Sequence, residues 1–200
     1  MPRPKIEDVE SRLLQAGLEL FASHGTERVN TNSIARRAGL AVGTFYSHFP
    51  DKYALLREIE LRTLSGLRAA RLEAIAPIEL DPVARARASV DAAVRFAARH
   101  GQAYRVTFGR ERSGLARHGP VVSESARPLA SALRELQSEH RLDPELNAAL
   151  AARAYQSMEV GTLLWWLEDT ERASMTEIVE TLVRLHPAAV STERSSQASS

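Results

Sequence analysis

The chain has 200 residues, a net charge of +1 and no cysteine. This length allows one or two domains with a sizeable core, and the absence of cysteine excludes disulfides, thiolate metal sites and a thiol nucleophile. Because the net charge is close to zero, a nucleic-acid partner would have to bind a locally basic surface. There is no apolar run of membrane-spanning length and no signal-peptide pattern, so we expect a cytoplasmic protein without a membrane partner.

The first three predicted helices form an N-terminal unit. Apolar residues at steps of three and four predict a helix over residues 6–24. Asn30 is a suitable N-cap for a second helix, and Gly39 is placed to end that helix in the left-handed conformation. The third helix is expected from Val42 to His48, with polar and aromatic side chains on its outer side. A helix, a glycine turn and a short second helix of this kind describe a helix-turn-helix DNA reader.

The rest of the chain also predicts helices separated by stop signals. Asp51 is placed to cap a long helix that runs to about Ala76 and links the N-terminal unit to the later helices. Asp-Pro pairs and a capping box at Ser174 mark further helix starts. The later helices are expected over residues 82–100, 104–108, 120–140, 144–168 and 174–186.

These elements predict an all-α fold in which a three-helix DNA-binding domain is joined by a long helix to a larger helical domain. We expect residues 1–52 to form the helix-turn-helix domain and residues 53–188 to form a ligand-binding and dimerisation domain. Residues 189–200 are rich in serine and are expected to be a disordered tail.

Residues 34–55 carry a specific motif, which reads IARRAGLAVGTFYSHFPDKYAL. This stretch resembles the TetR/AcrR family of transcriptional regulators, whose pattern is roughly Ile-Ala-x-x-Ala-Gly-[Val/Leu]-x-x-Gly-[Thr/Ser]-[Leu/Phe]-Tyr-x-[His/Tyr]-Phe-x-x-Lys-x-x-Leu. Every fixed position from Ile34 to Leu55 is satisfied. One departure is Ala41, where the family often has a serine that caps the recognition helix, and losing such a cap costs about 1 kcal/mol.

The resemblance implies a homodimer that binds a palindromic operator in double-stranded DNA. It also implies that the C-terminal domain binds a small-molecule effector of unknown identity, and that the protein is a repressor which the effector releases. An activator role stays open. The alternative is a small-molecule-binding helical protein that has lost DNA binding, against which the intact Tyr46, His48 and Lys52 argue.

The residues expected to contact DNA lie in the two helices of the motif and just after it. The resemblance assigns base and phosphate contacts to the recognition helix and phosphate contacts to His48 and Lys52, whose side chains carry suitable donors. Val42 can touch a thymine methyl group. For Asn32 and Ser33 a purely structural role is an equal alternative. The complete set is Asn32, Ser33, Val42, Gly43, Thr44, Tyr46, Ser47, His48 and Lys52.

Aromatic residues and isolated polar groups on otherwise apolar helices indicate a pocket for a largely apolar compound with one polar anchor. The candidates are Phe96, Tyr104, Phe108, Tyr155, Glu159, Thr162 and Trp166. Ordinary core packing is the alternative for each of them. The other face of the long late helix, together with the last helix, is the candidate dimer surface. Its residues are Met158, Gly161, Trp165, Met175, Ile178, Val179 and Leu182. Which face serves which purpose is left open.

No sequence motif of an enzyme is present, since the chain lacks G-x-S-x-G, a P-loop and G-x-G-x-x-G. The late histidines have no partner at helical spacing, so we expect no metal site. We therefore predict a regulator that is not an enzyme and needs no cofactor.

Overall fold

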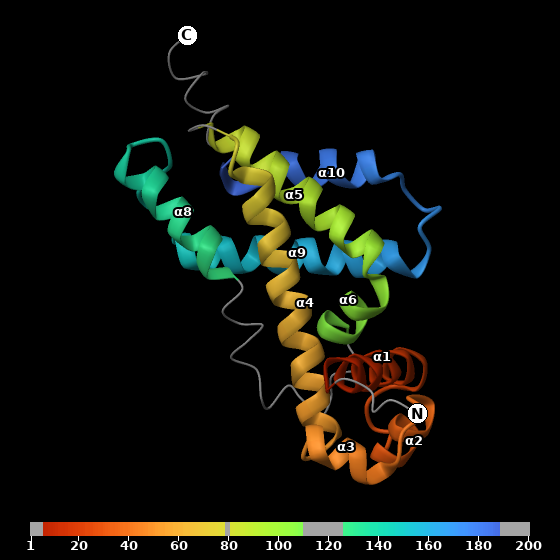
Figure 1. Cartoon of the computed structure of the whole chain (residues 1–200). Coiled ribbons are helices and arrows are strands. Elements are labelled where there is room, and N and C mark those ends of the chain that lie inside the picture. Colours follow the sequence, from red (N-terminus) through yellow and green to blue (C-terminus); the bar gives the residue numbers. More distant parts are fainter. Residues whose placement is uncertain (1–5, 79–80, 110–125, 189–200) are drawn as a thin grey trace. The chain divides into compact units, whose positions relative to one another are not determined.

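Every element of the computed structural model is a helix within the part of the chain that it describes, residues 6–78, 81–109 and 126–188. The predicted all-α class is therefore confirmed (Figure 1). The elements are α1 (Ile6–His24), α2 (Thr31–Arg37), α3 (Val42–His48), α4 (Lys52–Ile75), α5 (Pro82–Arg99), α6 (Gly101–Phe108), α8 (Arg127–Ser138), α9 (Ala148–Glu168) and α10 (Met175–Arg184).

The described residues form two compact units. The first contains residues 6–65 and 100–109, and the second contains residues 66–78, 81–99 and 126–188. The division does not fall at residue 52, where we expected a domain boundary, because the first half of α4 packs into the core of the first unit. Helix α6 also belongs to the first unit, since it packs against α1.

The core of the first unit is built from α1, α2, α3 and the start of α4. Leu13, Ile34, Phe45 and Leu55 are completely buried there. At Gly17 the backbone of α1 passes so close to α4 that an added Cβ would lie 2.3 Å from a methyl carbon of Leu55. A larger residue at this contact would therefore require the side chain of Leu55, which is completely buried, to shift.

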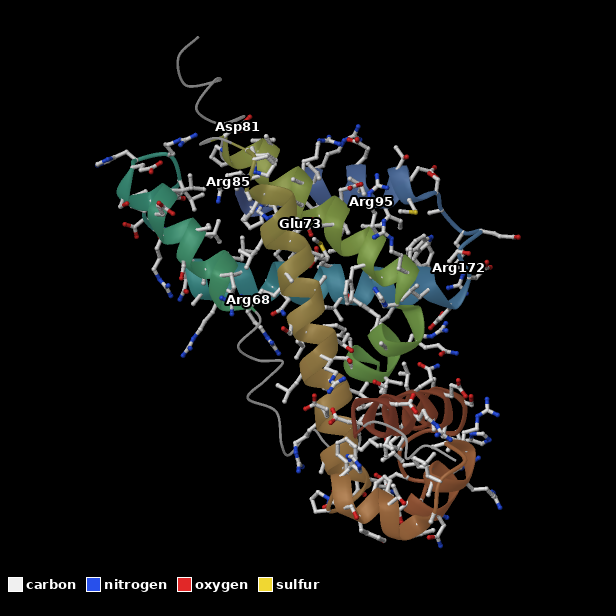
Figure 2. All side chains as sticks on the ribbon, in the orientation of Figure 1. Arg68, Glu73, Asp81, Arg85, Arg95 and Arg172 are labelled. Atoms are coloured by element: carbon white, nitrogen blue, oxygen red, sulfur yellow. The ribbon has the colours of Figure 1, made fainter. Side chains whose placement is uncertain are left out.

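In the second unit, α5 packs against α9 and α10, and α9 packs against α8. The turn between α9 and α10 is closed by two side chains. The Trp166 indole donates to the carbonyl of Ala173 at 2.9 Å, and Arg172 donates to the carbonyl of Trp165 at 2.9 Å. Figure 2 shows Arg172 at this turn.

The caps predicted for three helices are confirmed. The Asn30 side chain accepts from the amide of Ser33 at 2.8 Å, and the Ser33 hydroxyl bonds back to the backbone of Asn30. The same reciprocal arrangement joins Ser174 and Glu177 at the start of α10. Asp81, labelled in Figure 2 at the start of α5, accepts from the amide two residues ahead at 2.9 Å.

Helix α9 begins later than the Asp-Pro signal predicts. Instead of capping a helix at residue 144, Asp143 accepts from the amide two residues ahead at 2.9 Å and forms a turn. Asn147 is the true cap, because its side chain accepts from the amide of Leu150 at 3.1 Å. An Asp-Pro pair suits the start of a turn as well as that of a helix, so the signal is ambiguous.

Other boundaries differ by a few residues. Helix α6 begins at Gly101 rather than at residue 104, and α10 ends at Arg184 rather than at residue 186. The predicted start of a helix at residue 120 and the predicted disordered tail from residue 189 lie outside the described residues.

Candidate functional site

The turn between α2 and α3 is fixed by its backbone and by one arginine. Gly39 adopts a positive φ of 67°, as the motif predicts, and the amide of Leu40 donates to the carbonyl of Ala35 at 2.9 Å. Arg12 of α1 donates to the carbonyls of Ala38 at 2.7 Å and of Gly39 at 3.3 Å. Sequence reasoning missed Arg12, because its partners lie 26 and 27 residues further along the chain.

Helix α3 has one buried and one exposed side. Phe45 is buried in the core of the first unit, whereas the side chains of Val42 and Tyr46 are 36% and 54% exposed. A Cβ added to Gly43 would meet no atom within 4 Å, so the start of the helix is open to a close approach. The remaining predicted contacts on this helix are exposed or half-buried; they are Thr44, Ser47 and His48.

Helix α3 has no side-chain cap, as Ala41 predicts. The backbone of Ala41 has the extended N-cap conformation, with φ −70° and ψ 148°, but its side chain makes no hydrogen bond. The first amides of α3 therefore depend on short backbone contacts, such as Thr44 to the Ala41 carbonyl at 2.9 Å. This leaves a helix N-terminus with free donor capacity on the exposed side of the unit.

The start of α2 is tied to α3 by a hydrogen bond that sequence reasoning did not foresee. The hydroxyls of Thr31 and Tyr46 lie 3.1 Å apart. The two residues of α2 that were predicted to contact DNA differ in whether their side chains are free to do so. Ser33 is engaged in the capping box, whereas Asn32 is exposed. A structural role for Ser33 therefore accounts for its hydroxyl in the free protein.

Lys52, which the motif places as a phosphate contact, has its ammonium group turned to the backbone. It donates to the carbonyls of Thr26 at 2.8 Å, Glu27 at 3.3 Å and Val29 at 2.8 Å. An ammonium group has three N–H donors, so these carbonyls match its full capacity. In the free protein Lys52 thus fixes the loop between α1 and α2 against the start of α4.

Part of the positive charge near α2 and α3 is neutralised by an acidic residue of the same unit. The Arg37 guanidinium donates to Glu19 at 2.7 Å. Hydrogen bonds from Gln15 and then from Arg37 hold the pKa of Glu19 below its ordinary value. By contrast, Arg28 and Arg36 are exposed, so they can contribute to a locally basic surface.

The seven residues predicted to line a pocket do not all belong to one unit. Tyr104 and Phe108 lie on α6 in the first unit, where their rings pack together with centroids 4.5 Å apart. Phe96 lies on α5 in the second unit and packs against Gly66. The other four share α9, where Thr162 is half-buried and Tyr155, Glu159 and Trp166 are buried.

The buried face of α9 holds an ion pair. Arg71 of α4 donates to Glu159 at 2.6 Å and to the Ser89 hydroxyl at 3.0 Å. Burial, and next the charge of Glu159, raise the pKa of Tyr155, whose hydroxyl donates to the carbonyl of Leu182 at 3.0 Å. Sequence reasoning missed Arg71, because Glu159 lies 88 residues further along the chain.

His186 is a second buried titratable group in this unit. Burial, with a smaller contribution from the charge of Arg71, lowers its pKa to about 4. Its Nδ1 accepts from the amide of Ala188 at 3.2 Å, and its ring meets the ring of Tyr155 at a centroid distance of 4.6 Å. The neutral form of this histidine is therefore part of the folded core.

The residues predicted for a dimer surface divide into two sets. On α9, Gly161 and Trp165 are exposed and Met158 is half-buried. On α10, Met175 is half-buried, whereas three residues are buried in the chain's own core; these are Ile178, Val179 and Leu182. These three side chains are therefore covered by the chain's own core, and the exposed residues of the predicted set lie on α9.

The acidic and histidine side chains do not form a metal site in the part of the chain that the structure describes. Within residues 6–78, 81–109 and 126–188, no three His, Asp or Glu side chains are grouped so that they could hold a metal ion. None of the helices in these ranges is long and apolar enough to cross a membrane.

A family model described as "Bacterial regulatory proteins, tetR family" matches residues 13–59. These residues include α2, α3 and Lys52. Residues 13–59 therefore resemble the DNA-binding domain of TetR-family regulators. It is 38% identical over 48 residues to the uncharacterized HTH-type transcriptional regulator YvdT of Bacillus subtilis, and 30% identical over 81 residues to the regulator AcrR of Shigella flexneri. The matches cover 24% and 40% of this chain, and 25% and 38% of those relatives.

Solved structures resemble the chain over most of its length. The fatty acid degradation regulator FadR from Bacillus halodurans superposes with a TM-score of 0.77 at 18% identity, covering 93% of this chain and 97% of that one. The TetR-family regulator PfmR from Thermus thermophilus gives 0.65 at 23% identity, covering 88% and 94%. These likenesses confirm the TetR fold. The relatives are transcriptional regulators, in agreement with the expectation that the chain is not an enzyme.

Proposed function

We propose that the chain is a homodimeric transcriptional repressor that binds a palindromic operator and leaves it when a largely apolar small molecule binds. The observation that carries the proposal is the exposed side of α3 within a TetR-type helix-turn-helix. Val42, Gly43 and Tyr46 lie together on that side and have no role in the core. A short helix that presents small, apolar and hydroxyl-bearing groups suits the major groove.

Each contact in this proposal depends on what the side chain can offer. The methyl groups of Val42 can meet a thymine methyl, and the absence of a side chain at Gly43 lets the helix approach the base edges. The Tyr46 hydroxyl and the His48 imidazole can donate to backbone phosphates, and so can the uncapped amides of α3. Asn32 stands exposed on the preceding helix as a further polar contact.

The dimer surface that we propose is an exposed stripe on α9. Leu150 and Trp165 are 66% and 46% exposed, and the exposed Ala154 and Gly161 lie between them at helical spacing. Large apolar side chains with small residues between them let two helices approach closely. A two-fold dimer presents two recognition helices, and a palindromic operator needs them roughly 34 Å apart, one turn of DNA.

Release by an effector is proposed as a population shift. Helix α4 is a single element that supplies residues to both units, and in this proposal it passes a change at one end to the other. An effector that binds one spacing of the reading heads better than another lowers operator affinity by that difference in affinity.

A gel-shift titration on the palindromic DNA upstream of the protein's own gene tests the proposal. We expect salt-sensitive binding that Tyr46→Ala weakens and that a control substitution at an exposed position of α8, Glu135→Ala, leaves unchanged. Absence of binding by the wild-type dimer would reject the repressor and favour a helical ligand-binding protein that has lost DNA recognition.

A further inference from the structure

Glu159, in the second unit, carries a buried polar atom that has no hydrogen-bond partner among the described residues. Glu159 is 3% exposed, and its Oε2 accepts from Arg71 at 2.6 Å. Its Oε1 is shielded from solvent and has no hydrogen-bond partner among the described residues. Buried polar atoms in folded proteins are paired in the great majority of cases, and an unpaired carboxylate oxygen is costly. This oxygen is therefore an acceptor that a donor from outside the described chain could fill.

The hydrogen-bond donors of two buried aromatic residues on α9 are already engaged. The Tyr155 hydroxyl donates a hydrogen bond to the carbonyl of Leu182, and the Trp166 indole donates one to the carbonyl of Ala173. Arg71 is held from two sides, by Ser89 of α5 and by Glu159 itself. The Oε1 of Glu159 therefore receives no hydrogen bond from these side chains, and the ion pair with Arg71 holds the carboxylate in place.

We propose that the free Oε1 of Glu159 anchors the effector, and that the effector is a largely apolar compound bearing an uncharged hydrogen-bond donor, such as a hydroxyl group. The inference rests on the proposed function, in which the second unit takes an effector. The donor is uncharged because Arg71 already balances the carboxylate, so a further positive charge would be buried without compensation. A carbonyl or carboxylate ligand would set its lone pairs against those of Glu159.

Matched alcohols and ketones test this chemistry on the wild-type protein without DNA. Menthol and menthone form one pair, and cyclododecanol and cyclododecanone form another, with nearly the same shape within each pair. Binding is followed by the fluorescence of the two tryptophans, which both lie on α9, and is checked by calorimetry. We expect each alcohol to bind about tenfold more tightly than its ketone, the gain of one hydrogen bond to a charged group. We expect menthylammonium to bind more weakly than menthol.

The variant Glu159→Gln should invert the preference. Its amide oxygen has to face the donors of Arg71, which leaves its NH2 group at the open position as a donor. The ketones should then bind more tightly than the alcohols. Glu168→Gln, at the exposed end of the same helix, should keep the wild-type preference. If Glu159→Gln does not fold, the relative affinities of each alcohol and its ketone for the wild-type protein still test the proposed anchor.

Three results would overturn the inference. They are equal or tighter binding of the ketones by the wild type, an unchanged preference in a folded Glu159→Gln protein, and no saturable binding of either alcohol, which would leave the oxygen to a water molecule. Failure of the proposed function looks different. Operator binding without an alcohol preference would reject the anchor alone, whereas an alcohol preference without operator binding would reject the repressor alone.

Discussion

The ammonium group of Lys52 joins the start of α4 to three carbonyls of the loop between α1 and α2. Replacing it in Lys52→Met removes these charge-assisted bonds and leaves partly buried carbonyls without a donor. We expect the free energy of unfolding to fall by roughly 1–3 kcal/mol, measured by urea denaturation. Arg28→Met, which removes an exposed cation from the same loop, is the control and should change the stability little.

The same variant separates positioning from phosphate contact. If Lys52 holds the loop, Lys52→Met lowers operator affinity but leaves the slope of log K against log salt unchanged. A phosphate contact would instead reduce the slope by about one. A reduced slope would indicate that Lys52 contacts a DNA phosphate directly.

His186 makes the stability of the second unit depend on pH. Its pKa is about 4 in the folded protein, against 6.5 for an ordinary histidine. Between these values the unfolded chain binds a proton that the folded protein resists, so stability falls as the pH is lowered from about 6.5 to about 4. The full loss is on the order of 3 kcal/mol.

Urea titrations across this pH range, on the wild type and on His186→Asn, measure the effect. Asparagine keeps an acceptor for the amide of Ala188 but does not titrate. Glu177 and Glu180 have lowered pKa values, so stability from both carboxylates is also lost on acidification. The difference between the two proteins isolates the histidine, and identical pH profiles would contradict this account.

At the scale of the elements, α3 has a backbone prepared for a cap that its sequence does not supply. Ala41→Ser places a hydroxyl where the N-cap geometry already exists. We expect a gain of about 1 kcal/mol in the free energy of unfolding, together with tighter operator binding because the helix is more ordered before it meets DNA. Ala41→Val, which adds a side chain without an acceptor, should show neither effect.

Helix starts could be predicted from the sequence wherever the cap and its partner are neighbours. Asn30 could be predicted as a cap and Ser174 with Glu177 as a capping box, because each cap lies three residues from its partner. The helix start predicted after Asp143 was wrong, because aspartate favours turns and helix caps to a similar degree. The face of α6 that packs on α1 carries no such local pattern, so its place in the first unit was not predicted.

The candidate sites divide in the same way. The exposed residues of α3 are indicated by one motif and one helical period, so Val42 and Tyr46 could be placed correctly on the outer side. Arg12, Lys52 and Arg71 bind partners that are distant in sequence. An arginine or lysine on a helix does not reveal such a partner, because its long side chain can reach solvent, phosphate or a carbonyl equally well.

At the scale of the whole molecule, the stripe on α9 predicts a variant that stays folded but does not dimerise. A Cβ added at Gly161 would meet no atom of the other described elements within 4 Å. Gly161→Arg should therefore fold as the wild type does, while blocking a second helix that approaches closely. Sedimentation should show a monomer, and operator affinity should fall. Ser131→Arg, at an exposed position of α8, should remain a dimer, and a dimeric Gly161→Arg protein would place the interface elsewhere.

The packing of α6 on α1 has a consequence for protein engineers who build sensors by exchanging DNA-binding heads between relatives. The head of this protein is not one continuous stretch, because residues 100–109 complete the unit that residues 6–65 begin, and Val106 packs against its core. A chimera joined at a single point after residue 65 would pair α1 with a foreign helix that never co-evolved with it. A working graft would have to transplant both segments, or redesign the surface that they share.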